Sequence, residues 1–285
     1  MSRPSWVFAN VLTGAAILVQ LKARGSGGAG GLVEERIAYG EDPAQHVIVV
    51  RPERATSQTP LVYFIHGGSW RHGRPALYKG VGRFFASQGY AVALGGYRLV
   101  PRHVFPAQRD DVFAGLGAAV AHARSVGIRA EPVLLMGHSA GAHLAALAAF
   151  DEESREAAGL GDLRLAGLLS VSGPLDFDLL CPSPGSCPLI EALMGGRDGW
   201  DAANPACFVH GVRPLPVLCV HGSRDPLVPP EVSASFVTCA NESDGDHALL
   251  MTDPRGHHSD MVRVLLGDSP VTRPVLDWVA AIIRD

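Results

Sequence analysis

The chain has 285 residues and a formal net charge of −4 at pH 7, with 47% apolar and 18% charged residues. This length and composition suit a globular protein with a sizeable core and exclude a disordered chain. Lys and Arg are scattered, so there is no basic field for nucleic acid and we expect no nucleic-acid partner.

The first 23 residues predict an N-terminal apolar helix. Residues 6–21, "WVFANVLTGAAILVQL", are short for a membrane span and are interrupted by Asn10, Thr13 and Gln20. A small-x-small signal cleavage site does not follow convincingly. We favour a helix that packs on the body or on a partner chain, and hence a cytoplasmic protein. Membrane contact through this helix, or export, is the alternative.

Residues 24–31, "RGSGGAGG", read as a flexible linker, and residues 32–285 as a single domain. Short apolar, β-branched runs in this domain predict strands, and longer amphipathic runs predict helices. The predicted strands cover residues 46–51, 61–68, 90–96, 132–138, 165–173, 215–223 and 247–253. The predicted helices include residues 76–89, 105–127, 142–150, 259–267 and 272–285, and further helical stretches lie between the last three predicted strands.

Strands that alternate with helices indicate an α/β fold with a mainly parallel sheet covered on both faces. The sequence shows no internal repeat and no second domain. Residues from about 175 to 213 are rich in Pro, Gly and Cys. We interpret them as an excursion over one end of the sheet, where loops commonly build binding sites.

Five cysteines cannot all pair internally. Cys181 and Cys187 flank a short Pro/Gly loop and could form a disulfide, although two reduced thiols are the favoured interpretation. The sequence contains no C-x-x-C pair and no H-E-x-x-H motif. We therefore expect no metal site and no cofactor.

The pentapeptide Gly137-His138-Ser139-Ala140-Gly141 follows a predicted buried strand and precedes a helix rich in small residues. This is the context in which G-x-S-x-G forms a nucleophile elbow, a strained turn that presents a serine. The two glycines would let the strand and helix approach closely, and the N–H of Ala140 would face a developing oxyanion. The alternative is a small-residue turn used only for packing.

A second motif, "FIHGGSW" at residues 64–70, ends an earlier predicted strand. A His-Gly-Gly loop at that point can turn backbone N–H groups toward a substrate carbonyl, which a Cβ would obstruct. It would then complete an oxyanion hole together with Ala140. The alternative is a plain Gly-Gly strand exit.

The acid and base of a triad have candidates further along the chain. Asp225 lies in "HGSRDPLVP", just after a predicted strand, where an acid can orient a histidine. "RGHHSDMV" offers two adjacent histidines, of which we favour His258 over His257 because it directly precedes a predicted helix. Other acids and serines lack these settings: Asp110, Asp111, Asp253, Asp260, Ser69, Ser172 and Ser223.

From about Pro60 onward, the chain resembles serine esterases of the α/β-hydrolase superfamily. The stretches "HGGSW", "YRLVP", "GHSAGAHLA" and "HHSDMV" resemble the branch that holds carboxylesterases, kynurenine formamidase and isoprenylcysteine methylesterase. The resemblance implies an α/β-hydrolase fold, with Ser139 as nucleophile and Asp225 and His258 as its relay. It also implies backbone oxyanion donors at Gly68, Ser69 and Ala140.

These motifs predict a serine hydrolase that cleaves small carboxylic esters through an acyl-enzyme, without metal or organic cofactor. An arylformamidase-type amide hydrolase and a membrane-associated methylesterase or lipase are the alternatives, followed by a non-catalytic binding protein of the same fold. The substrate pocket has four apolar candidates: Trp70, Phe105, Leu180 and Trp200.

Overall fold

The computed structural model describes residues 31–181, 187–196, 199–210, 214–242 and 245–284. The predictions for residues 1–23, including membrane contact, lie outside the described residues. So does the linker prediction, apart from Gly31. Within the described part of the chain, every helix is too short or too polar to cross a membrane.

Eight strands form one sheet in the order β1-β2-β4-β3-β5-β6-β7-β8. The pairs β1–β2 and β2–β4 are antiparallel, and the remaining pairs, from β4–β3 to β7–β8, are parallel. This matches the predicted mainly parallel sheet. The strands are β1 (Leu32–Ala38), β2 (His46–Pro52), β3 (Pro60–Ile65), β4 (Ala91–Gly95), β5 (Arg129–His138), β6 (Leu165–Val171), β7 (Val217–Gly222) and β8 (Ala248–Asp253).

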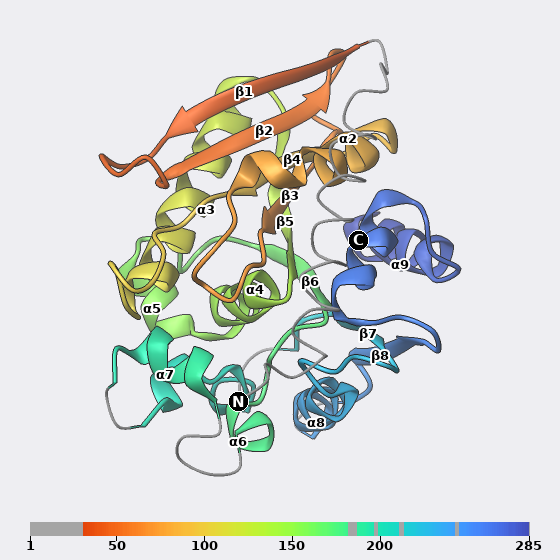
Figure 1. The fold of residues 1–285 in the computed structure, drawn as a ribbon. Coiled ribbons are helices and arrows are strands. Elements are labelled where there is room, and N and C mark those ends of the chain that lie inside the picture. Colours follow the sequence, from red (N-terminus) through yellow and green to blue (C-terminus); the bar gives the residue numbers. More distant parts are fainter. Residues whose placement is uncertain (1–30, 182–186, 197–198, 211–213, 243–244, 285) are drawn as a thin grey trace.

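Helices cover both faces of the sheet (Figure 1). One face carries α3 (Ala107–Ser125), α4 (Ala140–Phe150) and α8 (Pro230–Asn241). The other carries α2 (Lys79–Ser87), the 3-10 helix η4 (His258–Leu266) and α9 (Thr272–Arg284). Adjacent residues of β3 show the division, because Tyr63 packs in the first core and Phe64 in the second. Central strands buried on both faces must be apolar throughout, which is why the sequence predicted them.

The excursion between β6 and β7 contains short helices, seen beside α4 at the lower end of Figure 1. Its helices are α6 (Phe177–Leu180), α7 (Pro188–Met194), η2 (Asp201–Ala203) and η3 (Pro205–Cys207). Asp178 ties α6 to the segment that holds η2 and η3, since its two carboxylate oxygens accept hydrogen bonds from Trp200 and Asn204. A disulfide joins Cys181 to Cys187, so the favoured interpretation of two reduced thiols is wrong.

Besides the helices of the excursion, two elements were not predicted from the sequence: the strand β1 and the short helix at Glu152–Ala157. β1 is an edge strand whose residues alternate between exposed and half-buried. It carries the charged run Glu34–Arg36, which obscured its strand character. The 3-10 helix η1 (Pro75–Tyr78) precedes α2 and forms the start of the stretch predicted as a helix from residue 76. The helix α5 (Glu152–Ala157) follows α4 directly after its capping residue Asp151.

Candidate active site

The predicted elbow is a sharp turn between β5 and α4. Ser139 has φ 55° and ψ −125°, a strained conformation for a residue with a side chain. A Cβ on Gly137 would lie 2.3 Å from the carbonyl oxygen of Gly141, and one on Gly141 would lie 2.1 Å from that of Ile65. Both positions therefore require glycine, because strand and helix touch there through backbone atoms.

Ser139, His258 and Asp225 form a continuous chain of hydrogen bonds. The Ser139 Oγ lies 2.7 Å from Nε2 of His258, whose Nδ1 lies 2.7 Å from Oδ2 of Asp225. His258 is the first residue of η4 and is almost fully buried. The alternative base, His257, is 51% exposed and has its Nδ1 3.4 Å from Asp260. The structure therefore brings His258, and not His257, to the serine.

Asp225 lies in the loop after β7, with a fully buried carboxylate. Its Oδ1 accepts the backbone N–H groups of Leu227 and Val228, both at 2.9 Å. Its Oδ2 accepts the hydrogen bond from Nδ1 of His258 and also lies 3.3 Å from Nε2 of His221. Burial alone would raise the pKa of Asp225, but these two histidines outweigh it and hold the pKa well below its usual range. The acid is therefore ionised at neutral pH.

Residues 66–70, which we call the oxyanion loop after its predicted role, are held in unusual backbone geometry. Gly68, Ser69 and Trp70 all have positive φ, at 131°, 54° and 55°. A Cβ at Gly68 would lie 2.1 Å from the carbonyl oxygen of His72, so only glycine fits. The N–H groups of Gly68 and Ser69 have no hydrogen-bond partner among the described residues. The N–H of Ala140, the first residue of α4, has no acceptor within its helix.

The four candidate pocket residues divide into two pairs. Trp70 and Phe105 are buried in the core. The indole of Trp70 donates to Nδ1 of His143, and the backbone N–H of Phe105 donates to the carbonyl of Leu193. Leu180 and Trp200 are partly exposed on the excursion. A role of these four residues in substrate binding stays a prediction.

The sequence motifs did not identify four residues that surround the site: Tyr78, His138, His143 and His221. All are buried, and each bonds to a group distant in the sequence or to Asp225. The available signal was the pair of histidines one residue before and four residues after Ser139. Nothing local, however, tells a supporting histidine from an ordinary core histidine.

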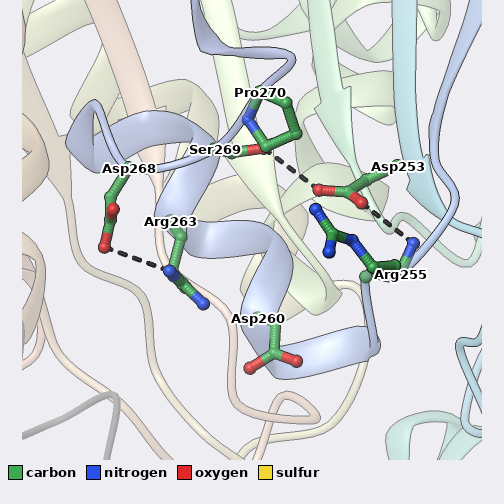
Figure 2. A pocket seen from close by; sticks show the side chains of 8 residues that line it. Asp253, Arg255, Asp260, Arg263, Asp268, Ser269 and Pro270 are labelled. Carbon is green, nitrogen blue, oxygen red and sulfur yellow. Dashed lines mark hydrogen bonds and ion pairs between the residues drawn. The ribbon is translucent and has the colours of Figure 1, made fainter.

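A cavity of about 280 Å³ lies beside the turn that leads to His258 (Figure 2). Its walls include Asp253, which accepts hydrogen bonds from Ser269 and from the backbone of Arg255. These bonds brace the turn. The cavity is lined mainly by charged side chains and by none of Ser139, Asp225 and His258, so it is unsuited to an ester's acyl group.

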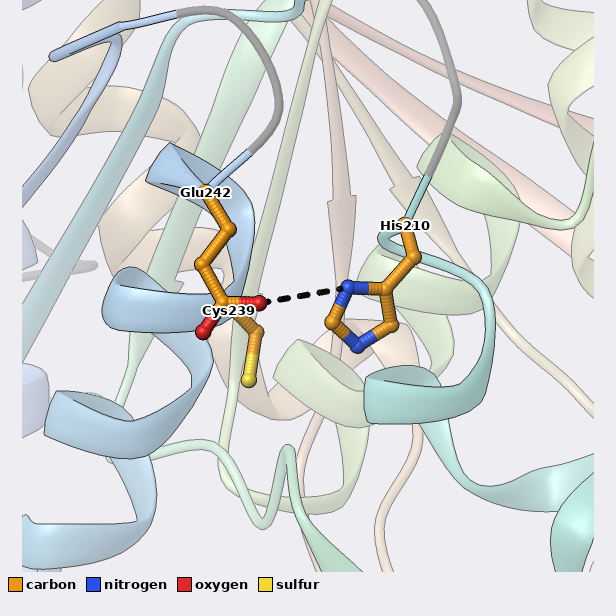
Figure 3. Close-up of side chains that lie close together, drawn as sticks. All are labelled: His210, Cys239 and Glu242. Carbon is orange, nitrogen blue, oxygen red and sulfur yellow. Dashed lines mark ion pairs between the residues drawn. The ribbon is translucent and has the colours of Figure 1, made fainter.

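One group of possible metal ligands occurs among the described residues, formed by His210, Cys239 and Glu242 (Figure 3). Their donor atoms lie within 4.8 Å of one another, and two of the three side chains are exposed. Zinc accepts such donors. The cluster is separate from the Ser139 site, and the expectation that the protein uses no metal stays a prediction.

The family model named BD-FAE matches residues 48–239, more than half of the chain. Esterase LipC of Mycobacterium tuberculosis is 30% identical over 217 residues, which cover 71% of this chain and 53% of that protein. A probable isoprenylcysteine alpha-carbonyl methylesterase of Arabidopsis thaliana, ICMEL1, is 24% identical over 269 residues, or 83% of this chain and 56% of the relative. The chain thus spans about half the length of the curated relatives it matches.

Solved structures match over nearly the whole length of both chains. Esterase B of Lactobacillus rhamnosis, inhibited by a tributyrin phosphonate, has a TM-score of 0.79 and is 25% identical. That match covers 99% of this chain and 97% of esterase B. A bacterial heroin esterase has a TM-score of 0.69 at 22% identity, covering 95% of this chain and 90% of the other. The topology, the elbow and the matching family model agree: this chain has the α/β-hydrolase fold and belongs to the BD-FAE family.

Proposed function

We propose that this protein is a serine esterase that hydrolyses small carboxylic esters through an acyl-enzyme intermediate. The observation that carries the proposal is the 2.7 Å contact between Ser139 Oγ and His258 Nε2, at a strained elbow and backed by a buried carboxylate. A serine needs such a base to become a nucleophile at neutral pH.

In the proposed mechanism, His258 removes the Ser139 proton as Oγ attacks the ester carbonyl. The negative charge on the carbonyl oxygen is stabilised by the N–H groups of Gly68, Ser69 and Ala140. Each such donor contributes on the order of 3 kcal/mol to transition-state stabilisation. Asp225 stays ionised and stabilises the imidazolium. Collapse of the tetrahedral intermediate releases the alcohol, which takes its proton from His258.

Water then repeats the sequence on the acyl-enzyme. His258 takes a proton from water, hydroxide adds to the acyl carbonyl, and Ser139 leaves with the proton returned by His258. The acid product departs and the starting enzyme is restored. No other group is needed to balance the two half-reactions.

The comparisons favour short acyl chains. Esterase B is inhibited by a tributyrin phosphonate, and it matches this chain over almost its full length. A methyl ester is a second candidate substrate, because several of the similar relatives carry the name methylesterase. Both candidates use the same acyl-enzyme chemistry and differ only in the acyl and alcohol groups.

The test is a panel of p-nitrophenyl acetate, butyrate, octanoate and dodecanoate, with a prenylcysteine methyl ester and N-formylkynurenine beside them. We expect fastest turnover on the short esters. Ser139→Ala and His258→Ala should each lower kcat about 10⁶-fold. His257→Ala is the matched control, since it removes the neighbouring exposed imidazole, and should leave kcat unchanged. Normal turnover by Ser139→Ala would overturn the proposal, and deformylation without ester cleavage would move the assignment to the formamidase.

A further inference from the structure

Tyr78 and His138 lie between the oxyanion loop and the triad histidine. We propose that these two residues are positioning residues for the reaction, joined in a hydrogen-bond chain that sets the backbone of His258 relative to Gly67. The inference rests on the proposed function. The chain runs from Gly67 N–H to the Tyr78 hydroxyl at 3.3 Å, on to His138 Nδ1 at 3.2 Å, and from His138 Nε2 to the His258 carbonyl at 3.3 Å.

Only one arrangement of protons satisfies this chain. The His258 carbonyl can only accept, so Nε2 of His138 carries the hydrogen and donates it. Nδ1 of His138 is then an acceptor, and the Tyr78 hydroxyl must donate to it. The Tyr78 oxygen remains free to accept the N–H of Gly67. All three hydrogen bonds are therefore donated in one direction, from the oxyanion loop through Tyr78 and His138 to the His258 carbonyl.

Both side chains keep the protonation state that this arrangement requires. Burial raises the pKa of Tyr78 to about 12, so its hydroxyl retains the proton. Burial, and then the nearby His258, lower the pKa of His138 to about 3, so its ring is neutral near pH 7. A charged His138 would lose its acceptor and would place a second cation beside the imidazolium that forms during catalysis.

The packing leaves little room for these groups to move apart. A Cβ on Gly67 would lie 2.7 Å from the His138 carbonyl oxygen and 3.0 Å from its Nδ1, so the loop backbone rests directly on the elbow. The rings of His138 and His258 have centroids 5.6 Å apart. The oxyanion loop and the base reach the site from β3 and η4, and His138 is the residue of β5 that contacts both.

Neither Tyr78 nor His138 touches the reacting atoms in this arrangement. Their loss should leave ground-state binding intact while it misaligns the donors and the base in the transition state. The expected effect is a lower kcat with little change in KM, by about 10- to 100-fold, the range typical of groups that orient active-site residues from outside.

The first test compares Tyr78→Phe with Tyr63→Phe. The Tyr63 hydroxyl is also buried and donates one hydrogen bond, to the Val112 carbonyl at 3.2 Å, but it packs in the core on the other face of the sheet. Both variants lose one buried hydroxyl, so a merely structural role predicts similar effects on kcat. The positioning role predicts that only Tyr78→Phe lowers kcat, on the best ester of the panel.

The second test is rescue at residue 138. His138→Gln keeps one donor and one acceptor at the end of the side chain, whereas His138→Leu keeps only the apolar volume. We expect Gln to retain at least about tenfold more kcat than Leu, with similar KM. Equal kcat in the two variants would show that the position is only filled space. If the Leu variant fails to fold, the comparison of Tyr78→Phe with Tyr63→Phe still tests the positioning role.

The outcomes separate this inference from the proposed function. Wild-type turnover that survives in Ser139→Ala would remove the proposed function and the inference with it. Turnover that depends on Ser139, with Tyr78→Phe matching both Tyr63→Phe and wild type in kcat, would overturn the positioning role and leave the esterase intact. A selective loss of kcat in Tyr78→Phe supports the inference.

Discussion

The imidazole of His143 stacks on the ring of Phe177, with centroids 4.9 Å apart and planes 9° apart. His143 lies in α4, four residues after Ser139, and Phe177 begins α6 of the excursion. Nδ1 of His143 accepts a hydrogen bond from the indole N–H of Trp70 at 3.2 Å, and Nε2 of His143 donates to the Ala203 carbonyl at 2.6 Å. One buried ring therefore joins the oxyanion loop, the elbow helix and the excursion.

His143→Leu should lower the free energy of unfolding by about 2–4 kcal/mol, because it leaves a buried indole N–H and a buried carbonyl without partners. Urea denaturation measures this quantity. His210→Ala removes an exposed imidazole and should change the free energy by no more than about 0.5 kcal/mol. A loss in His143→Leu no larger than in this control would contradict the linking role.

Stability should fall as the solution is acidified below pH 6.5. Burial lowers the pKa of His66 and His143 to about 4, and burial together with His258 lowers that of His138 to about 3, from an ordinary value of 6.5. Between pH 6.5 and about 4, the unfolded chain binds protons at these three sites and the folded chain does not. The free energy of unfolding therefore drops as pH falls, by at most about 1.4 kcal/mol per pH unit for each histidine.

The pH dependence is measured by urea denaturation at several pH values across this window. His143→Gln removes one of these three histidines and should make the slope shallower, by at most about 1.4 kcal/mol per pH unit. A slope in the variant equal to that of the wild type would show that His143 takes up a proton in the folded state.

Two helical glycines should respond oppositely to alanine. A Cβ at Gly141 would collide with the backbone oxygens of Ile65 and His66, at 2.1 and 2.6 Å. Gly141→Ala should cost about 1–3 kcal/mol of stability and should lower esterase activity, since it displaces the end of α4 that carries Ala140. A Cβ at Gly117, in α3, would make only an ordinary 3.7 Å contact with Leu160.

Gly117→Ala should therefore stabilise the protein by about 0.5–1 kcal/mol, through helix propensity, and leave activity unchanged. Thermal unfolding and ester turnover of the two variants test the contrast. An active, stable Gly141→Ala would mean that the elbow helix does not touch β3 through its backbone.

Thiol titration tests the Cys181–Cys187 disulfide. Among the five cysteines, Cys207, Cys219 and Cys239 are free. Purified protein unfolded without reductant should expose three reactive thiols, and five after reduction. Five thiols before reduction would show that the disulfide is absent in the protein as purified.

Much of the fold was accessible from the sequence because the central strands are buried on both faces. A strand such as β3 is apolar at almost every position, and such an apolar run can be recognised from the local sequence alone. β1 was missed because its charges are neutralised only in three dimensions. Glu34 pairs with Lys79 and Arg83, and Glu35 pairs with Arg51 of the neighbouring strand.

The excursion lies between β6 and β7, and its helices were not predicted. α6 has four residues, too few to show helical periodicity, and it is stabilised by contacts from elsewhere. Asp176 caps it and also accepts a hydrogen bond from Ser235, 59 residues away. The cysteine spacing alone left the pairing of Cys181 with Cys187 undecided.

The three triad candidates could be named because each lies in a motif with its own local context. The groups that hold them could not, because their bonds cross long stretches of chain. His138 reaches a carbonyl 120 residues later, and Tyr78 reaches a ring 60 residues later. No periodicity or motif marks such a partner, so these contacts appear only in the folded structure.

The most direct test of the central claim is the position of a phosphonate adduct. Wild-type protein treated with a short-chain alkyl p-nitrophenyl phosphonate should lose ester turnover in proportion to labelling, with one adduct on the peptide that contains Ser139. Ser139→Ala should take up no label, and His258→Ala should label far more slowly than wild type. Full inactivation with the adduct on any other residue, or unimpaired turnover after Ser139 is labelled, would contradict the account.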